Sequence, residues 1–354
     1  MDNLIGKNKL LMKLYLKTNK KTKKDVTPLF DACDKGYENR VKYLIEHGAD
    51  INKEVYGGKT PLFTACEKGY ETIVKYLVEH GANVNKQDNY GKTPLFDACW
   101  KGRENIVKCL VGHGADMHKE DEEGFTPFIY ACSYEHENIV KYLVEHGGDI
   151  NKEDTFGKTP LFYACIYNHK NTIKYLIEQG ADINKEDKEG KTPIFYACEN
   201  GYEDLVKYLI EHGADIKKEN KIKETPLFIA CEKGHLKIVK YLVEQGADVN
   251  KEDIEGKTLI FYACTNGHED IVKYLVEQGV DIHKENDDGE TALFNAYYNG
   301  NEAIIKYLED HGADVNKKNR FGETPLTKEN NMVICDVNGR EFLGTFNSAW
   351  IKCQ

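Results

Sequence analysis

Gly-Lys-Thr, the triplet that ends a phosphate-binding loop, occurs five times in the sequence, and a cysteine follows each threonine by six residues. In the stretch DKEGKTPIFYAC these are Thr192 and Cys198. A loop that cradles phosphate groups needs a further glycine five residues before the glycine of the triplet. Lysine stands there in every copy, so we expect no nucleotide site. The five lysines are Lys53, Lys86, Lys152, Lys185 and Lys251.

Cysteine and histidine recur four residues apart, a spacing that suits two zinc ligands on one helix face. No second pair converges on any of them, and the sequence contains no Cys-x-x-Cys. A catalytic centre would be a singular constellation, whereas nearly every polar residue here recurs. We therefore expect no metal, no cofactor and no catalytic residue, and conclude that the chain is not an enzyme. The pairs are Cys132/His136, Cys165/His169, Cys231/His235 and Cys264/His268.

These residues return because the chain is built from repeats of 33 residues. Thr-Pro, or a close variant of it, begins at ten positions with no insertion or deletion between them. A fixed period of this length indicates a solenoid of small stacked units. The ten positions are Thr27, Thr60, Thr93, Thr126, Thr159, Thr192, Thr225, Thr258, Thr291 and Thr324.

The repeat over residues 187–219 predicts a turn, a short helix, a second turn and a second helix. Thr192 is a candidate helix cap, with proline at the first helical position after it. Gly201 ends the first helix, because the residue after a helix is often a left-handed glycine. Apolar residues at helical spacing predict the second helix over about 203–212, and Gly213 stops it.

This unit resembles the ankyrin repeat, and the resemblance covers residues 27 to about 326. It implies an all-α, ankyrin-repeat solenoid of stacked helix-turn-helix units with β-turn fingers, elongated and curved. It also implies a concave groove, lined by the first helices and the turn tips, that binds a protein. In one copy the matching residues are Asp88, Gly91, Thr93, Pro94, Leu95, Ala98, Gly102, Ile106, Val107, Leu110, Val111, Gly114, Ala115 and Asp116.

Two departures from the family pattern are systematic. The family's histidine after Thr-Pro-Leu is replaced by phenylalanine in eight copies and by Ile129 in one, so apolar packing must replace its hydrogen bonds. The family's second alanine is cysteine in eight copies, from Cys33 to Cys264. Neighbouring helices pack about 8–10 Å apart, too far for a disulfide. We expect buried thiols that act as small apolar residues, which fits an intracellular, reducing compartment such as the cytoplasm.

Charge and hydropathy exclude several classes of partner. The net charge is −11, with a net +6 in residues 1–26 and −17 in the remainder. An acidic body argues against nucleic acid as a partner. No apolar run is long enough to span a membrane, so we expect no membrane insertion. The lysine that recurs in each second helix usually has glutamate four residues earlier, which favours helix ion pairs on a solvated face.

Specificity in a repeat protein comes from positions that vary between copies. The residue before the Ala-Cys pair, the two residues after it and the turn tips become aromatic or apolar in repeats three to six and charged on either side. An aromatic centre with a charged rim is typical of binding hot spots. The alternative is that these aromatics only pack on one another between repeats. The candidate partner-binding residues are Trp100, Tyr130, Tyr134, Tyr163, Ile166, Tyr167, Tyr196, Tyr90, Phe125 and Phe156.

Two positions break the glycine pattern. Lys223 replaces the turn glycine before Thr225, and Glu135 replaces the glycine that ends the first helix of repeat four. Each substitution should cost about 1 kcal/mol if the left-handed backbone is kept. Either the turn is remodelled or the strain is tolerated, and we favour tolerance.

We divide the chain into a basic cap or worn half-repeat over 1–26, an ankyrin-repeat domain over 27–326 and a divergent tail over 327–354. In the tail, Asn338-Gly339 favours a hairpin turn, and Phe342, Phe346 and Trp350 either cover the last repeat or belong to a disordered end. We expect a monomeric, non-catalytic scaffold that binds a protein or peptide. The alternative is a recruiting fragment of a larger multidomain protein.

Overall fold

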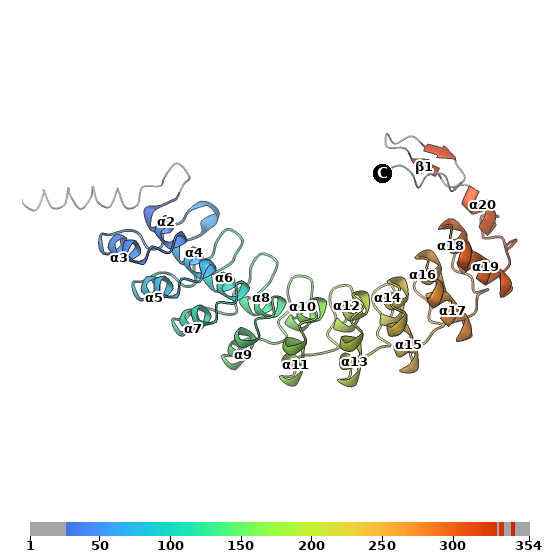
Figure 1. Ribbon diagram of the computed structural model, residues 1–354, viewed down its shortest axis with the longest axis horizontal. Coiled ribbons are helices and arrows are strands. Elements are labelled where there is room, and N and C mark those ends of the chain that lie inside the picture. The colour runs from blue at the N-terminus through green and yellow to red at the C-terminus, as the bar shows by residue number, and fades with distance from the viewer. Residues whose placement is uncertain (1–25, 331–332, 336–340, 344–354) are drawn as a thin grey trace, which may run out of the picture. The chain divides into compact units, whose positions relative to one another are not determined.

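Each repeat forms two helices joined by a turn, and a longer finger-like loop leads to the next repeat (Figure 1). The computed structural model describes residues 26–330, 333–335 and 341–343. The chain divides into two units, 1–182 and 183–354.

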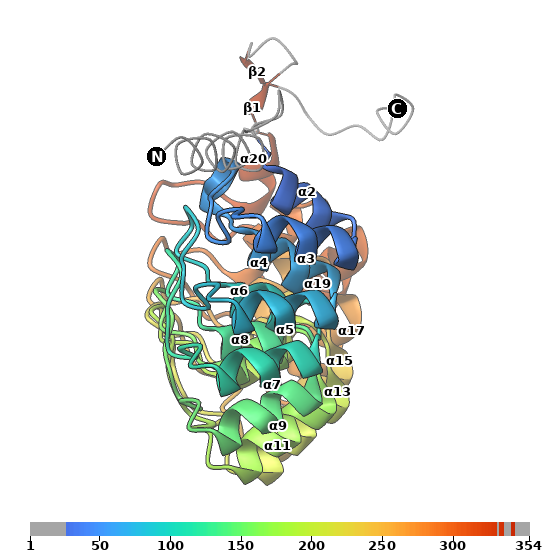
Figure 2. The ribbon, with the colours of Figure 1, turned by 90° about the vertical axis from the view of Figure 1, so that its left-hand side faces the viewer.

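In the first unit, the first helices of successive repeats pack side by side and the second helices form a parallel row (Figures 1 and 2). The first helices are α2 (Pro28–Asp34), α4 (Pro61–Lys68), α6 (Pro94–Trp100), α8 (Pro127–Ser133) and α10 (Pro160–Ile166). The second helices are α3 (Glu38–Glu46), α5 (Glu71–Glu79), α7 (Glu104–Gly112), α9 (Glu137–Glu145) and α11 (Lys170–Glu178), and the short 3-10 helix η1 spans Tyr56–Gly58.

The second unit repeats this arrangement and adds a pair of strands. Its first helices are α12 (Pro193–Glu199), α14 (Pro226–Glu232), α16 (Leu259–Thr265), α18 (Ala292–Tyr298) and α20 (Pro325–Asn330). Its second helices are α13 (Glu203–Glu211), α15 (Leu236–Glu244), α17 (Glu269–Glu277) and α19 (Glu302–Asp310). The strands β1 (Val333–Cys335) and β2 (Glu341–Leu343) pair antiparallel.

The threonine before each first helix has an extended backbone, as a helix cap should, but its hydroxyl seldom makes the capping bond. Thr27 accepts from the Phe30 amide and Thr126 accepts from the Ile129 amide. Thr192 makes no such bond, so the capping role of its hydroxyl was wrongly predicted. At Thr192 and four equivalent threonines, the buried hydroxyl has no hydrogen-bond partner among the described residues.

The recurrent phenylalanine forms much of the core and offers these hydroxyls no hydrogen-bond partner. Seven of the eight phenylalanines at this position, including Phe96 and Phe195, are fully buried and only Phe30 in the first repeat is partly exposed, which confirms the predicted apolar packing. Phenylalanine cannot hydrogen-bond, so a threonine hydroxyl beside it gains no partner from that side chain. The five threonines whose hydroxyls lack a partner, Thr60, Thr93, Thr159, Thr192 and Thr258, each stand three residues before a phenylalanine.

The cysteines form the predicted buried ladder. All eight of its thiols are unpaired and buried. Burial raises the pKa of Cys33 to about 12 and raises the pKa of Cys99 and Cys198 further. A thiol held in its neutral form is a poor nucleophile, so these residues serve packing.

Hydrogen bonds between neighbouring repeats hold the fingers and helix ends together. In the first unit, the Glu122 amide donates to the Tyr90 carbonyl at 3.1 Å, linking two fingers. At the helix ends, His136 Nε2 lies 2.9 Å from the Trp100 carbonyl and must donate to it. A Cβ on Gly102 would lie 2.6 Å from the His136 ring, so glycine there makes room for the histidine of the next repeat. His136 therefore serves to join its repeat to the preceding one.

The two irregular positions keep the left-handed backbone. Glu135 has φ 58° and Lys223 has φ 62°, left-handed values that lie a little below those of the glycines at equivalent positions. Local remodelling is excluded, and the strain is tolerated, as predicted. Asn168, also at φ 57°, is a third such position.

The tail strands pair with Ile334 opposite Phe342, which agrees with a hairpin. The predicted turn at Asn338-Gly339 lies outside the described residues, as do Phe346, Trp350 and the cap over 1–25.

Candidate partner-binding surface

The variable positions of the first unit lie on the row of first helices and on the fingers. Helices α6, α8 and α10 are neighbours in this row. Trp100 ends α6, Tyr130 lies within α8, and Tyr163 lies within α10. The repeats thus bring residues 33 apart in sequence onto adjacent helices.

Trp100, Tyr130 and Tyr134 form one aromatic group. The Trp100 and Tyr134 rings meet edge to face with centroids 6.2 Å apart. The Tyr130 and Tyr134 rings are nearly parallel at 6.5 Å. Lys101 Nζ lies 3.5 Å from the centroid of the Trp100 ring, a cation–π contact. The contacts fix the ring orientations.

Phe125, on a finger, extends this group toward the next repeat. Its ring lies edge to face against Tyr130 at 5.8 Å and against Tyr163 at 5.3 Å. The five rings from Trp100 to Tyr163 therefore form a chain of contacts across three repeats.

The tyrosine that precedes Ala-Cys is tied to the finger of its own repeat. The Tyr130 hydroxyl donates to Asp121 Oδ2 at 3.2 Å, and the Tyr163 hydroxyl donates to Asp154 Oδ2. Burial, followed by the charge of Asp121, raises the pKa of Tyr130, so this hydroxyl remains a donor. In the second unit, the Tyr196 hydroxyl donates to Asp187 Oδ2 at 2.6 Å, and burial raises its pKa too.

The same tie occurs outside repeats three to six. The Tyr262 hydroxyl donates to Asp253 Oδ2 at 2.7 Å. Each of these aspartates also accepts, through Oδ1, two backbone amides of its finger, as Asp187 does from Glu189 and Lys191. This position therefore has a structural function wherever tyrosine follows an aspartate by nine residues.

The other predicted aromatic residues of the first unit are not in this ring chain. Tyr90, Phe156 and Tyr167 are 62%, 51% and 55% exposed, and Tyr134, within the ring chain, is 49% exposed. The Tyr167 ring stacks on His169 of its own repeat at 5.8 Å. Among the described residues, neither Tyr90 nor Phe156 makes a ring contact.

Ile166 is partly exposed at the end of α10. Tyr196 lies in α12 of the second unit, as described above.

Sequence reasoning missed a buried ion pair in this region. Asp97 occupies the same repeat position as Tyr130 and is only 5% exposed. Lys59 Nζ lies 3.1 Å from its Oδ2. Burial raises the pKa of Asp97 to about 6, although Lys59 opposes this change. The sequence did carry a signal for this ion pair, because Asp97 is an aspartate at a repeat position where other copies have tyrosine.

A second feature missed by sequence reasoning is a pocket of about 400 Å³ in the second unit. It lies between α16 and α18 and their fingers, and its lining includes Thr265, Asn295, Tyr298 and Asn299. These are variable positions of repeats eight and nine, which carry uncharged polar residues and a tyrosine instead of the predicted charged rim.

Neither surface brings together groups for chemistry. The described histidines at the helix ends, such as His136 and His268, donate to backbone carbonyls of the preceding repeat. Among residues 26–330, 333–335 and 341–343, no three His, Cys, Asp or Glu side chains gather as metal ligands would. No helix in this part of the chain is long and apolar enough to cross a membrane.

Comparisons with known proteins agree with the repeat structure. The family model "Ankyrin repeats (3 copies)" matches residues 55–121, 98–187, 146–220, 182–253, 217–286 and 252–319. The model "Ankyrin repeats (many copies)" matches residues 29–77. A search of curated proteins found no match.

Among solved structures, the crystal structure of the human ASB11 ankyrin repeat domain is similar, with a TM-score of 0.58 and 28% sequence identity. The alignment covers 63% of this chain and 99% of that one. Ankyrin repeats are generally protein-interaction modules, and their fold is typically non-enzymatic. The chain belongs to the ankyrin-repeat family.

Proposed function

We propose that the chain is a non-catalytic interaction module that binds a protein or peptide through the aromatic residues of repeats three to six. The observation that carries the proposal is the chain of rings from Trp100 to Tyr163, which includes the half-exposed Tyr134, together with the exposed rings of Tyr90, Phe156 and Tyr167. Rigid aromatic side chains bind at a low entropic cost because they are already ordered.

The residues of this proposed site have different roles. Tyr130, Tyr163 and Phe125 are held by ring contacts and hydrogen bonds, so they support the surface. Trp100, Tyr134 and Tyr167 are the proposed anchors, with Ile166, Tyr90 and Phe156 around them. Tyr196 is proposed as a further contact residue in the second unit.

Two features support an intracellular site of action for a scaffold of this kind. The nine described thiols are unpaired, and the eight of the ladder are buried. Disulfides form in oxidising compartments, and unpaired thiols persist in reducing ones.

The proposal is tested by affinity capture from source-cell lysate with wild type and with the variant Trp100→Ala/Tyr134→Ala/Tyr167→Ala. Partners that bind through the aromatic residues should be lost by the variant while circular dichroism shows an unchanged helix signal. Retention of the same partners by the folded variant would refute the proposed site.

A matched control removes three exposed aromatics elsewhere, with Tyr43→Ala/Tyr298→Ala/Phe321→Ala. This variant should keep the partners. Equal loss by both triple variants would show that general surface hydrophobicity, rather than repeats three to six, retains the captured proteins.

A further inference from the structure

The pocket of about 400 Å³ between α16 and α18 lies where other repeats hold a tyrosine ring, and Asn295 of α18 lines it. Other repeats have tyrosine at the position of Asn295, as at Tyr130 and Tyr262. The Tyr262 ring lies edge to face against Phe228 of the preceding repeat, with centroids 5.4 Å apart, and its hydroxyl donates to Asp253. Asparagine is too short to fill the same space, so the ninth repeat is left with an open pocket.

The walls of the pocket agree with this comparison. Around the Tyr130 ring, Lys92 Nζ lies 4.8 Å from the centroid, and Asp121 accepts the tyrosine hydroxyl. The residues at the two equivalent positions near the pocket are Lys257 and Asn286, and both line it. The pocket therefore suits a planar side chain with a hydrogen-bond donor at its end, as tyrosine is in the other repeats.

The finger gives the pocket a negative charge. Glu290 is buried and accepts the Asn319 amide group at 3.1 Å. Asp288 is exposed and forms no ion pair with any described residue. Lys257 supplies the ammonium group of the lining, and its Nζ is held 2.5 Å from Glu255 Oε2. The lining therefore has two carboxylates against one ammonium group, whose charge is already paired.

An earlier repeat pair shows that a cation can occupy this space. Lys59, the equivalent of Lys257, extends to Asp97, the equivalent of Asn295, with 3.1 Å between Nζ and Oδ2. In the ninth repeat an amide replaces that carboxylate, and Lys257 pairs within its own finger instead. The space that Lys59 fills between its two repeats is thus open here, next to the carboxylates of the neighbouring finger.

Neutral acceptors and an aromatic ring complete the lining. The Asn295 side-chain amide donates to Thr265 Oγ1 at 2.6 Å, and the Asn299 side-chain amide donates to the Asn295 backbone carbonyl at 2.9 Å. Each side chain keeps its own carbonyl oxygen as an acceptor. The Tyr298 ring beside them is half exposed. A guanidinium group stacks on aromatic rings and donates to several acceptors in one plane, whereas an ammonium group is a strongly hydrated point charge.

We propose that this pocket binds an arginine side chain from a segment of a second partner protein, distinct from the partner of repeats three to six. Charge complementarity selects a cation. The space for a planar group, with amide and carboxylate acceptors around it, selects a guanidinium group over an ammonium group. The pocket shares no residue with the aromatic surface of repeats three to six, so either proposal can fail without the other.

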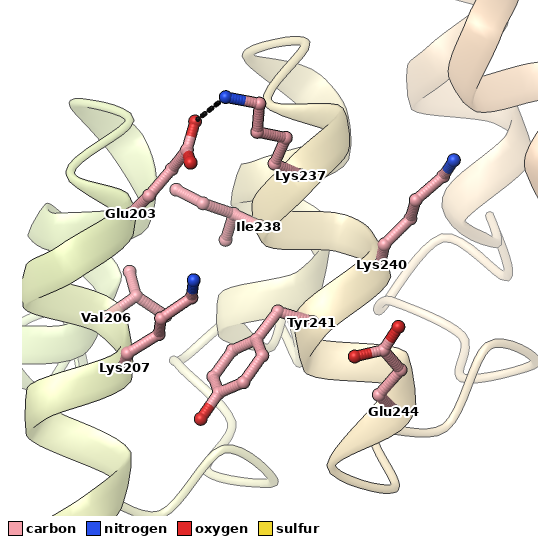
Figure 3. Close-up of a pocket in the computed structure, with 8 residues that line it drawn as sticks. All are labelled: Glu203, Val206, Lys207, Lys237, Ile238, Lys240, Tyr241 and Glu244. Carbon is pink, nitrogen blue, oxygen red and sulfur yellow. Dashed lines mark ion pairs between the residues drawn. The ribbon is translucent and has the colours of Figure 1, made fainter.

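A hollow of about 220 Å³ between α13 and α15, in the same unit, provides the control (Figure 3). Three lysines and two glutamates line it, and Glu203 pairs with Lys237 at 3.3 Å, so this hollow does not select a cation. Glu244 is an exposed carboxylate of its lining. Glu244→Gln therefore changes the net charge of the chain as Asp288→Asn does, but away from the proposed pocket.

The probe is the blocked tripeptide acetyl-Gly-Arg-Gly-amide, titrated into the full chain and followed by the NMR signals of the Asn299 side-chain amide. The arginine tripeptide should shift these signals along a saturable curve. The citrulline tripeptide, which keeps the shape but not the charge, should leave them unchanged, and the lysine tripeptide should bind at least about threefold more weakly. These titrations use the wild-type chain, so they do not depend on the folding of any variant.

Variants then locate the binding. Asp288→Asn should weaken binding of the arginine tripeptide about threefold to fivefold, the scale of one exposed ion pair, and Glu244→Gln should change it by less than about twofold. Asn295→Tyr should abolish binding, because it places a ring in the pocket. The proposal is overturned if the Asn299 signals do not shift, if the citrulline or lysine tripeptide binds as tightly as the arginine tripeptide, if Glu244→Gln weakens binding as much as Asp288→Asn, or if folded Asn295→Tyr binds like wild type.

Discussion

Asp97 shows how one repeat position serves different purposes along the chain. Its neighbours at this position include the tyrosines that tie α8 and α10 to their fingers, whereas Asp97 reaches across to Lys59. The carboxyl group is buried, and its pKa is raised from 3.8 to about 6.

This pKa predicts a pH dependence of stability. Between about pH 4 and 6 the folded state keeps a proton that the unfolded state has released. The contribution of Asp97 to the free energy of unfolding is therefore full below pH 4 and falls, by up to about 3 kcal/mol, as pH rises through 6. Asp97→Asn should remove this decline and be the more stable form at pH 8.

Urea unfolding of wild type and Asp97→Asn, followed by circular dichroism from pH 4 to pH 8, measures this effect. Asp310→Asn, at an exposed position in α19, is the control and should follow the wild-type curve. A constant difference between wild type and Asp97→Asn across this range would contradict the account.

Residues other than glycine that adopt a left-handed backbone conformation lead to a second prediction for single residues. Lys223 is exposed and makes no ion pair with the described residues, so Lys223→Gly relieves strain and removes no contact. The free energy of unfolding should rise by about 1 kcal/mol. Thermal unfolding of the purified variant gives the measurement.

Glu135→Gly is the companion variant. Glu135 Oε2 lies 3.5 Å from His169 Nδ1, so its replacement relieves strain but also loses this contact. Its gain should be smaller than that of Lys223→Gly. A loss of stability on Lys223→Gly would show that its backbone is not strained.

At the scale of the element, the finger uses two alternative sets of polar contacts. Where aspartate begins the finger and tyrosine follows it by nine residues, as at Asp187 and Asp253, the second carboxylate oxygen accepts the tyrosine hydroxyl from the following helix. Where asparagine begins it, as at Asn220, the amide group donates instead to a glutamate four residues later, Glu224, at 2.8 Å. Asn319 and Glu323 repeat this second arrangement.

Asn220→Asp should therefore be destabilising at pH 7, by about 2–4 kcal/mol, because it places two buried carboxylates together. Glu224→Lys should offset part of this loss, since aspartate and lysine occupy the same two positions at Asp253 and Lys257. A double-mutant cycle by urea unfolding measures the coupling. Additive losses would show that the two side chains do not interact.

Much of each element could be predicted from sequence because the signals repeat. Proline at the first helical position and glycine after each helix set the bounds of α12 and α13 to within a residue or two. The capping bond of Thr192 could not be predicted in the same way. It depends on the distance between the hydroxyl and an amide, which the residue types alone do not set, since Thr27 makes the bond and Thr192 does not.

At the scale of the whole molecule, the repeats place residues 33 apart on neighbouring helices within each unit. Sequence comparison between repeats therefore identified the aromatic residues of repeats three to six as a group. It could not separate Tyr130, whose hydroxyl is bound to Asp121, from Tyr134, which is half exposed, because both are tyrosines at variable positions.

The measurement that most directly tests the proposed function is site-specific photo-cross-linking in source cells. A photoreactive amino acid would replace Tyr134 in one variant and Tyr298 in another, two exposed tyrosines in different units. The proposal predicts discrete adducts with a partner protein at position 134 and none of that partner at position 298. Adducts with the same protein at position 298 alone, or at neither position, would contradict it.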